Sequence, residues 1–82
     1  MFEYRTQGTC SSSITFGIED GKVHSVSFQG GCHGNLQGIG KLTEGMDAKE
    51  LIEKLQGIRC GSKPTSCPDQ LARAVTAALE QN

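Results

Sequence analysis

The segment SSITFGIEDGKVHSVSFQGG, residues 12–31, has the pattern of a β-hairpin. Large apolar residues alternate with small or polar residues on both sides of a turn: Ile14, Phe16 and Ile18 before it, Val26 and Phe28 after it. A period of two is typical of strands that are buried on one face only. The sequence therefore predicts two antiparallel strands that present one apolar face to the rest of the domain.

The hairpin turn can be built in two ways. A two-residue turn at Asp20-Gly21 would set Phe16 opposite Ser25, which mixes a buried face with an exposed one. A three-residue loop that ends with Gly21 in the left-handed conformation sets Phe16 opposite His24 instead. We expect the three-residue loop, with His24 as a half-buried structural residue.

The sequence on either side of the hairpin predicts one more strand and three helices. The expected strand is residues 2–7, with Phe2 and Tyr4 on one face, and the expected helices lie within residues 30–45, 46–57 and 67–81. This order predicts a single α+β domain over residues 1–82, a small three-stranded antiparallel sheet with helices on one face.

The ends and faces of the expected helices can also be predicted. In the first helix Leu36, Ile39 and Leu42 form an apolar stripe. Gly38 and Gly40 each weaken that helix by about 1 kcal/mol relative to Ala, which indicates close packing against a neighbour.

The two later helices begin with capping signals. Asp47 is expected to cap the second helix, with Glu50 three residues later, and Pro68 to occupy the first position of the third. Asp69 is expected to be a solvated residue of that helix's first turn.

Composition limits the class of protein. The chain has 82 residues, four aromatic side chains, eleven glycines and a net charge of −1. A core this thin is expected to need a disulfide, a metal or a partner. The balanced charge argues against nucleic-acid binding, since phosphate contacts need a basic face. We find no signal-peptide pattern at the N-terminus and no apolar run near the ~20 residues that span a bilayer, so we expect a cytoplasmic protein.

Four cysteines are the candidate functional residues: Cys10, Cys32, Cys60 and Cys67. Cys10 precedes the hairpin and Cys32 follows it, so the two are expected to meet at its open end. Cys60 and Cys67 flank a loop before the last helix, whose N-terminus favours a thiolate. All four therefore lie in turns or at element ends, where sites of chemistry are usually built.

Three interpretations of these cysteines are open. Four thiolates could bind zinc in a closed tetrahedral site, although no Cys-x-x-Cys pair is present. Cys60 and Cys67 could instead form a redox pair, because six intervening residues are easily bridged. The third interpretation is that the cysteines are small buried residues, which is common for free Cys.

The motifs GTCSSSITF, FQGGCHGN and RCGSKPTSCPDQLA resemble the small stand-alone four-cysteine proteins of the TSCPD domain family over essentially the whole chain. A similar domain lies at the C-terminus of adenosylcobalamin-dependent ribonucleotide reductases, and the stand-alone proteins are often named as putative ribonucleoside-diphosphate reductases. The resemblance thus implies a reductase as partner. We expect no reductase activity in this chain itself, because it has no nucleotide loop or radical motif and is too short for a radical barrel.

The order of motifs is also similar to the IscU-type iron–sulfur scaffold. In that resemblance Cys10, Cys32 and Cys67 fall on the three scaffold cysteines, and Ser66 stands where the scaffold has its histidine. The scaffold's aspartate, which is thought to keep the cluster labile, is replaced by Ser12, and its cochaperone loop is missing. The resemblance therefore implies a stable four-thiolate zinc site with an IscU-like fold more than delivery of an iron–sulfur cluster.

These observations lead to one expected function and its alternatives. We expect a zinc-binding accessory module. A thiol-redox accessory of ribonucleotide reductase that uses Cys60 and Cys67 is the alternative, and an iron–sulfur carrier is the third. The sequence does not indicate an oligomeric state.

Overall fold

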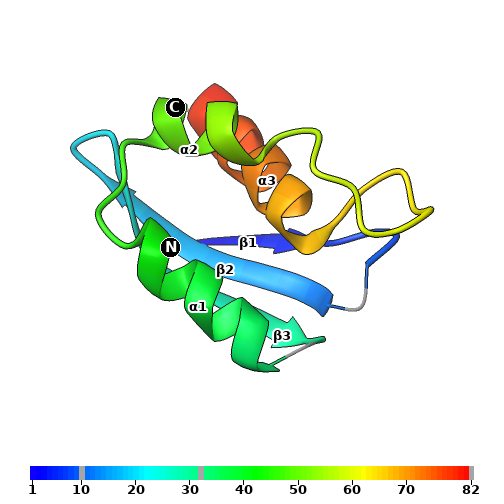
Figure 1. Cartoon of the computed structure of the whole chain (residues 1–82). Helices are drawn as coiled ribbons and strands as arrows, with labels where there is room; N and C mark the ends of the chain where they lie inside the picture. Colours follow the sequence, from blue (N-terminus) through cyan, green and yellow to red (C-terminus); the bar gives the residue numbers. More distant parts are fainter. Residues whose placement is uncertain (10, 32, 82) are drawn as a thin grey trace.

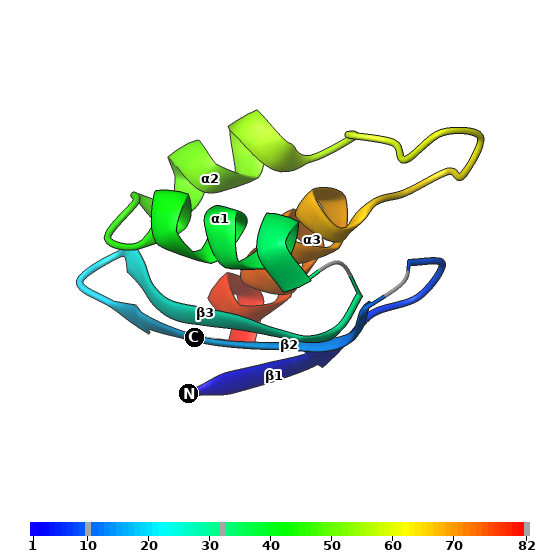
Figure 2. The ribbon, with the colours of Figure 1, turned by 60° about the horizontal axis from the view of Figure 1, so that its bottom comes forward.

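A computed structural model describes residues 1–9, 11–31 and 33–81. This part of the chain forms a three-stranded antiparallel sheet in the order β1-β2-β3, followed by three helices. The elements are β1 (Phe2–Arg5), β2 (Ser11–Glu19), β3 (Lys22–Gly30), α1 (His33–Thr43), α2 (Ala48–Leu55) and α3 (Cys67–Gln81). The helices gather over one side of the sheet (Figures 1 and 2), which confirms the expected α+β class.

The core lies between the sheet and the helices. Its fully buried members come from β2, β3, α2 and α3: Ile14, Phe16, Val23, Ala48, Leu51, Leu71, Ala74, Val75 and Ala78. Phe2 of β1 stacks on Phe16, with ring centroids 5.5 Å apart. Only four of these nine residues are larger than valine: Ile14, Phe16, Leu51 and Leu71. The apolar core is therefore small, as the composition indicates.

The predicted hairpin loop is wrong, although the hairpin itself is confirmed. Glu19 pairs with Lys22, so the turn has two residues, Asp20 and Gly21, with φ of 54° and 76°. Positive φ at both positions is the conformation whose twist suits a two-residue hairpin. The register conflict that argued against this turn is removed by a bulge further along β3.

The bulge lies at Ser25, whose φ is 59°. Thr15 pairs with Ser27 and Gly17 with His24, so β3 has one more residue than β2 in this interval. An inserted residue shifts the following side chains to the other face. The apolar residues of both strands can therefore share one face even though the turn is short.

Helix α1 lies along β3 and approaches it most closely at Gly40. A Cβ atom at Gly40 would lie 2.9 Å from the Val26 carbonyl oxygen, which confirms close packing at this glycine. Nothing lies within 4 Å of a Cβ at Gly38, so the same expectation is wrong there. The prediction for Leu42 is also wrong, because its side chain is 78% exposed while Thr43 is buried.

The end of α1 is bound to the bulge by Glu44. Its Oε1 accepts a hydrogen bond from the Ser25 N–H at 2.9 Å, and its Oε2 lies 2.7 Å from His24 Nδ1. The Ser25 N–H and then His24 lower the pKa of Glu44 below its ordinary value. His24 is partly buried, as expected, and its contact with Glu44 is structural.

The start of α2 agrees with the prediction. Asp47 Oδ2 accepts hydrogen bonds from the backbone N–H groups of Lys49 and Glu50, at 3.1 and 3.2 Å. This satisfies two of the donors that a helix N-terminus leaves free.

Candidate functional site around Cys67

Helix α3 begins at Cys67, and Ser66 is its N-cap. The Ser66 carbonyl accepts the first helical hydrogen bond from Gln70 N–H at 2.8 Å, and its hydroxyl accepts one from Asp69 N–H at 3.2 Å. Pro68 is therefore the second helical residue, one position later than predicted. The Cys67 thiol stands at the first helical position, where the helix dipole favours negative charge.

Cys67 is only 8% exposed, and its sulfur faces the start of β2. Its Sγ lies 3.3 Å from the hydroxyl of Ser11, which is itself buried. Ser11 follows Cys10 in the chain and pairs with Gly30 of β3, two residues before Cys32. The open end of the hairpin therefore lies against the first residue of α3.

The Ser11 hydroxyl can donate its proton to this sulfur. Thr9 Oγ1 lies 3.2 Å from Ser11 Oγ and 3.2 Å from the Ser11 carbonyl oxygen. The Thr6 hydroxyl also donates to that carbonyl oxygen. When Thr9 donates to Ser11 Oγ, the Ser11 proton is available to Cys67, because each hydroxyl has one proton and can also accept.

Cys60 lies on the exposed part of the loop that leads to α3. Its N–H donates to the Thr65 carbonyl at 3.2 Å, and its own carbonyl accepts from Lys63 N–H at 3.0 Å. Gly61 has φ of +60°, which allows the sharp turn that follows Cys60. Cys60 and Cys67 are both free thiols. The backbone of Cys60 is hydrogen-bonded to Thr65, which lies two residues before Cys67.

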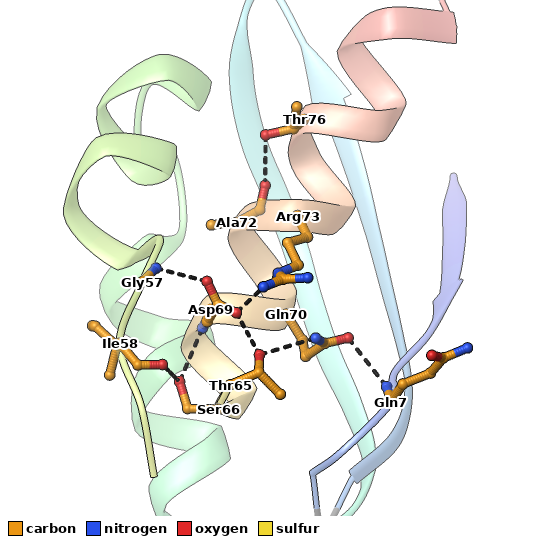
Figure 3. Close-up of polar contacts among 10 residues, drawn as sticks. All are labelled: Gln7, Gly57, Ile58, Thr65, Ser66, Asp69, Gln70, Ala72, Arg73 and Thr76. Atoms are coloured by element: carbon orange, nitrogen blue, oxygen red, sulfur yellow. Dashed lines mark hydrogen bonds and ion pairs between the residues drawn. The ribbon is translucent and has the colours of Figure 1, made fainter. Parts of the chain in front are cut away.

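A buried carboxylate holds this loop on α3 (Figure 3). Asp69 Oδ1 accepts from Gly57 N–H at 2.6 Å, and Oδ2 accepts from the Thr65 hydroxyl and from Arg73 Nε at 2.9 Å. Asp69 is 2% exposed, so its prediction as a solvated residue is wrong. Burial raises the pKa of Asp69, but the Thr65 hydroxyl, the Gly57 N–H and the guanidinium together lower it by more, which favours the ionised form.

Three further hydrogen bonds, made by Gln70 and Ser66, extend this network on either side. Gln70 donates to Thr65 Oγ1 at 3.0 Å and accepts from Gln7 N–H at 3.1 Å, which binds α3 to the β1–β2 connection. The Ser66 hydroxyl donates to the Ile58 carbonyl at 2.6 Å. The string Thr65-Ser66-Cys67-Pro68-Asp69 thus fixes the loop and the helix start around Cys67, since every polar side chain in it has a partner in this network (Figure 3).

The roles of Asp69 and Gln70 were not predicted from the sequence. Polar residues in the first turn of a helix are usually solvated, and the pattern gave no sign of burial. A usable signal was Ser66 three residues before Asp69, the spacing at which an N-cap serine and an acidic residue meet at a helix start.

The predicted four-cysteine site falls only partly within the described residues. Cys10 and Cys32 lie outside them. Among the side chains that the structure describes, which do not include that of His33, no three His, Cys, Asp or Glu are grouped so that they could bind a metal ion. The structure thus places Cys67 beside Ser11, whose strand partner is Gly30 of β3, and holds the backbone of Cys60 close to Thr65, two residues before Cys67.

Comparison with known proteins identifies one relation. The family model described as the TSCPD domain matches residues 2–79. No curated protein and no solved structure matches the chain. None of the helices in the described ranges has the length and apolar character needed to cross a membrane.

Proposed function

This chain belongs to the TSCPD domain family, and we propose that it is a small metal-binding accessory module. Cys10, Cys32, Cys60 and Cys67 bind one ion as thiolates, with zinc as the expected metal. The module acts through a protein partner and has no catalytic residues of its own.

The contact between Cys67 Sγ and Ser11 Oγ, 3.3 Å long, carries this proposal. Ser11 is next to Cys10 in the chain, and its strand partner Gly30 is two residues from Cys32. Cys67 is thus one member of the contacting pair, Cys10 is the chain neighbour of the other member, and Cys32 is two residues from the strand partner of Ser11. Such convergence of separated segments is what a structural thiolate site requires.

The surroundings of Cys67 suit a bound thiolate. The sulfur is nearly excluded from solvent, stands at a helix N-terminus and has a hydroxyl within hydrogen-bonding distance. Hydrogen bonds from neighbouring groups to metal-bound ligands typically orient them and tune the affinity for the metal. Sulfur ligands favour zinc or an iron–sulfur cluster over magnesium or calcium.

The small core gives metal binding an energetic role. Structural zinc sites contribute on the order of 10 kcal/mol at neutral pH. That is comparable with the whole stability of a small domain, about 5–15 kcal/mol. Loss of the ion is therefore expected to leave the loop at Cys60 and the open end of the hairpin unstable.

Cobalt substitution tests the ligand set. The metal-free protein should bind one Co²⁺ per chain and develop the visible and thiolate charge-transfer bands of a tetrahedral cobalt–thiolate complex. A Cys→Ser change at any of the four positions should weaken both the binding of Co²⁺ and the absorption bands. Ser62→Ala, an exposed change in the same loop as Cys60, is the matched control. Bands that are unchanged in Cys10→Ser and Cys32→Ser would contradict the proposal.

A second arm of the experiment tests the Ser11 hydroxyl. Ser11→Ala removes the donor to Cys67 and should weaken cobalt binding by about 10–100-fold. Ser12→Ala is the control, because Ser12 is exposed and donates to a backbone carbonyl on the outer side. Equal cobalt affinity in the two variants would remove Ser11 from the site.

The two free thiols at the ends of one loop favour a second candidate, a thiol-redox accessory of ribonucleotide reductase. Cys60 and Cys67 would be oxidised to a disulfide, and a disulfide of the reductase would receive their two electrons and two protons. Cys60 is exposed and could make the first attack. In this case the as-purified protein contains no metal, and the exposed Cys60 thiol is alkylated at once. A brown protein after anaerobic expression would instead indicate an iron–sulfur cluster.

A further inference from the structure

The two edges of the sheet differ in how they are protected. On β3, the Ser25 N–H is bound to Glu44 and the bulge interrupts the regular strand. Helix α1 lies along the same strand (Figure 2). A Cβ atom at Gly40 of this helix would lie 2.9 Å from the Val26 carbonyl oxygen. Bulges and covering helices are the devices by which proteins prevent an edge strand from pairing with another chain.

Strand β1, at the other edge, has no comparable cover within the described residues. Thr6 N–H donates to the Ser12 carbonyl of the next strand, at 3.1 Å. Backbone groups alternate in direction along an antiparallel strand. The N–H and C=O groups of Glu3 and Arg5 therefore point to the open edge, while those of Tyr4 point to β2.

A groove beside β1 could receive the side chains of an added strand. It lies between β1 and α3 and is lined by Phe2, Tyr4 and the small side chains Ala74, Ala77 and Ala78. Tyr4 is only half-buried and also lines the neighbouring hollow towards Arg73. The inner side of this edge is thus shallow, and Glu3 and Gln81 also line it beside the small alanine side chains against which a larger side chain could pack.

We propose that β1 pairs with β1 of a second copy of this chain, antiparallel about a two-fold axis at Tyr4. Glu3 of each copy then lies opposite Arg5 of the other, and the two sheets join into one of six strands. Each copy contributes the same surface, as a two-fold dimer requires.

Charge and backbone direction select this register. Because Glu3 and Arg5 both direct their backbone groups outward, only registers that pair such residues with each other form hydrogen bonds. A shift by two residues sets Glu3 opposite Glu3, which is repulsive. The register centred on Tyr4 forms two opposite-charge pairs and keeps the apolar face of both strands on the side of the helices.

Sedimentation equilibrium of the whole protein over micromolar to millimolar chain concentrations tests the pairing. The wild type should reach a dimer. Glu3→Arg sets like charges opposite each other twice and should weaken the dimer about tenfold or more, as should Arg5→Glu. The double exchange Glu3→Arg with Arg5→Glu should restore the dimer dissociation constant of the wild type. Glu53→Arg, an equal change of charge on the exposed face of α2, should leave it unchanged.

Amide hydrogen exchange locates the contact. The amide protons of Glu3 and Arg5 should become protected as the chain concentration rises, whereas that of Tyr4 is protected at every concentration. A wild type that is monomeric throughout the range overturns the proposal. So does a dimer that forms equally well in Glu3→Arg, or one without concentration-dependent protection at these two amides. The proposal does not rest on the cysteines.

Discussion

Replacement of Asp69 by Ala should be among the most destabilising changes outside the apolar core. It removes the acceptor of Gly57 N–H, of the Thr65 hydroxyl and of Arg73 Nε. Thr65 is buried, and a buried donor that loses its acceptor costs about 1–3 kcal/mol. Gly57 is exposed, so the loss of its hydrogen bond costs only about 0.5–1.5 kcal/mol. Arg73 is largely exposed and adds at most about 0.5 kcal/mol. The sum is about 3 kcal/mol, a large share of a small domain's stability.

Urea unfolding of the as-purified protein measures this loss. Asp69→Asn should cost less, about 1–2 kcal/mol, because an amide oxygen can still accept from Gly57 while the charge-assisted bonds are lost. Arg73→Ala isolates the exposed ion pair and should stay within about 0.5 kcal/mol of the wild type. If Asp69→Ala costs no more than Arg73→Ala, the buried network does not hold the loop, and the reasoning is refuted.

Two other changes test the packing of α1 on β3. Gly40→Ala should destabilise the protein despite Ala's higher helix propensity, since the new Cβ would lie 2.9 Å from a backbone oxygen of β3; Gly38→Ala, in open space, should stabilise it by up to about 1 kcal/mol in the same urea experiment. Glu44 has its pKa lowered from 4.5, first by the Ser25 N–H and then by His24. The contribution of Glu44 to the free energy of unfolding is therefore complete at pH values above its ordinary pKa of 4.5. This contribution is lost as the pH falls through the lowered pKa of the folded protein. Glu44→Gln should accordingly lower the urea midpoint at pH 7 and leave it nearly unchanged at strongly acid pH; an equal loss at both would argue against the role of the charge.

Local patterns were sufficient to predict the elements of the fold. The alternation of Ile14, Phe16 and Ile18 gave a strand, Asp47 gave the start of α2, and the strands-then-helices order gave the α+β class. These signals are contained within a few neighbouring residues. They do not depend on what the segment contacts later.

The errors arose where tertiary contacts decide the conformation. The hairpin register depends on the bulge at Ser25, which is bound to Glu44 nineteen residues away. The exposed side chain of Leu42 follows from how α1 lies on β3, where Thr43 is turned inward instead. Neither contact leaves a signal in the sequence next to these residues.

The candidate site was only partly predictable for a similar reason. Cys67 could be placed at the start of α3 and Cys60 in the loop before it, because glycine, proline and serine mark those ends. The placement of Cys10 and Cys32 lies outside the described residues and stays a prediction. The contact of Cys67 with Ser11 was not foreseen, since it joins the start of β2 to the start of α3. The burial of Asp69 depends on donors from Gly57 and Thr65 that only the folded loop brings together.

The most direct test of the account is to measure metal content and thiol reactivity of protein purified without added metal, before and after treatment with a chelator. The account predicts about one zinc per chain, with Cys10, Cys32, Cys60 and Cys67 protected from alkylation until the metal is removed. Protein without metal, in which Cys60 is alkylated at once and Cys60 and Cys67 oxidise to a disulfide, would contradict it.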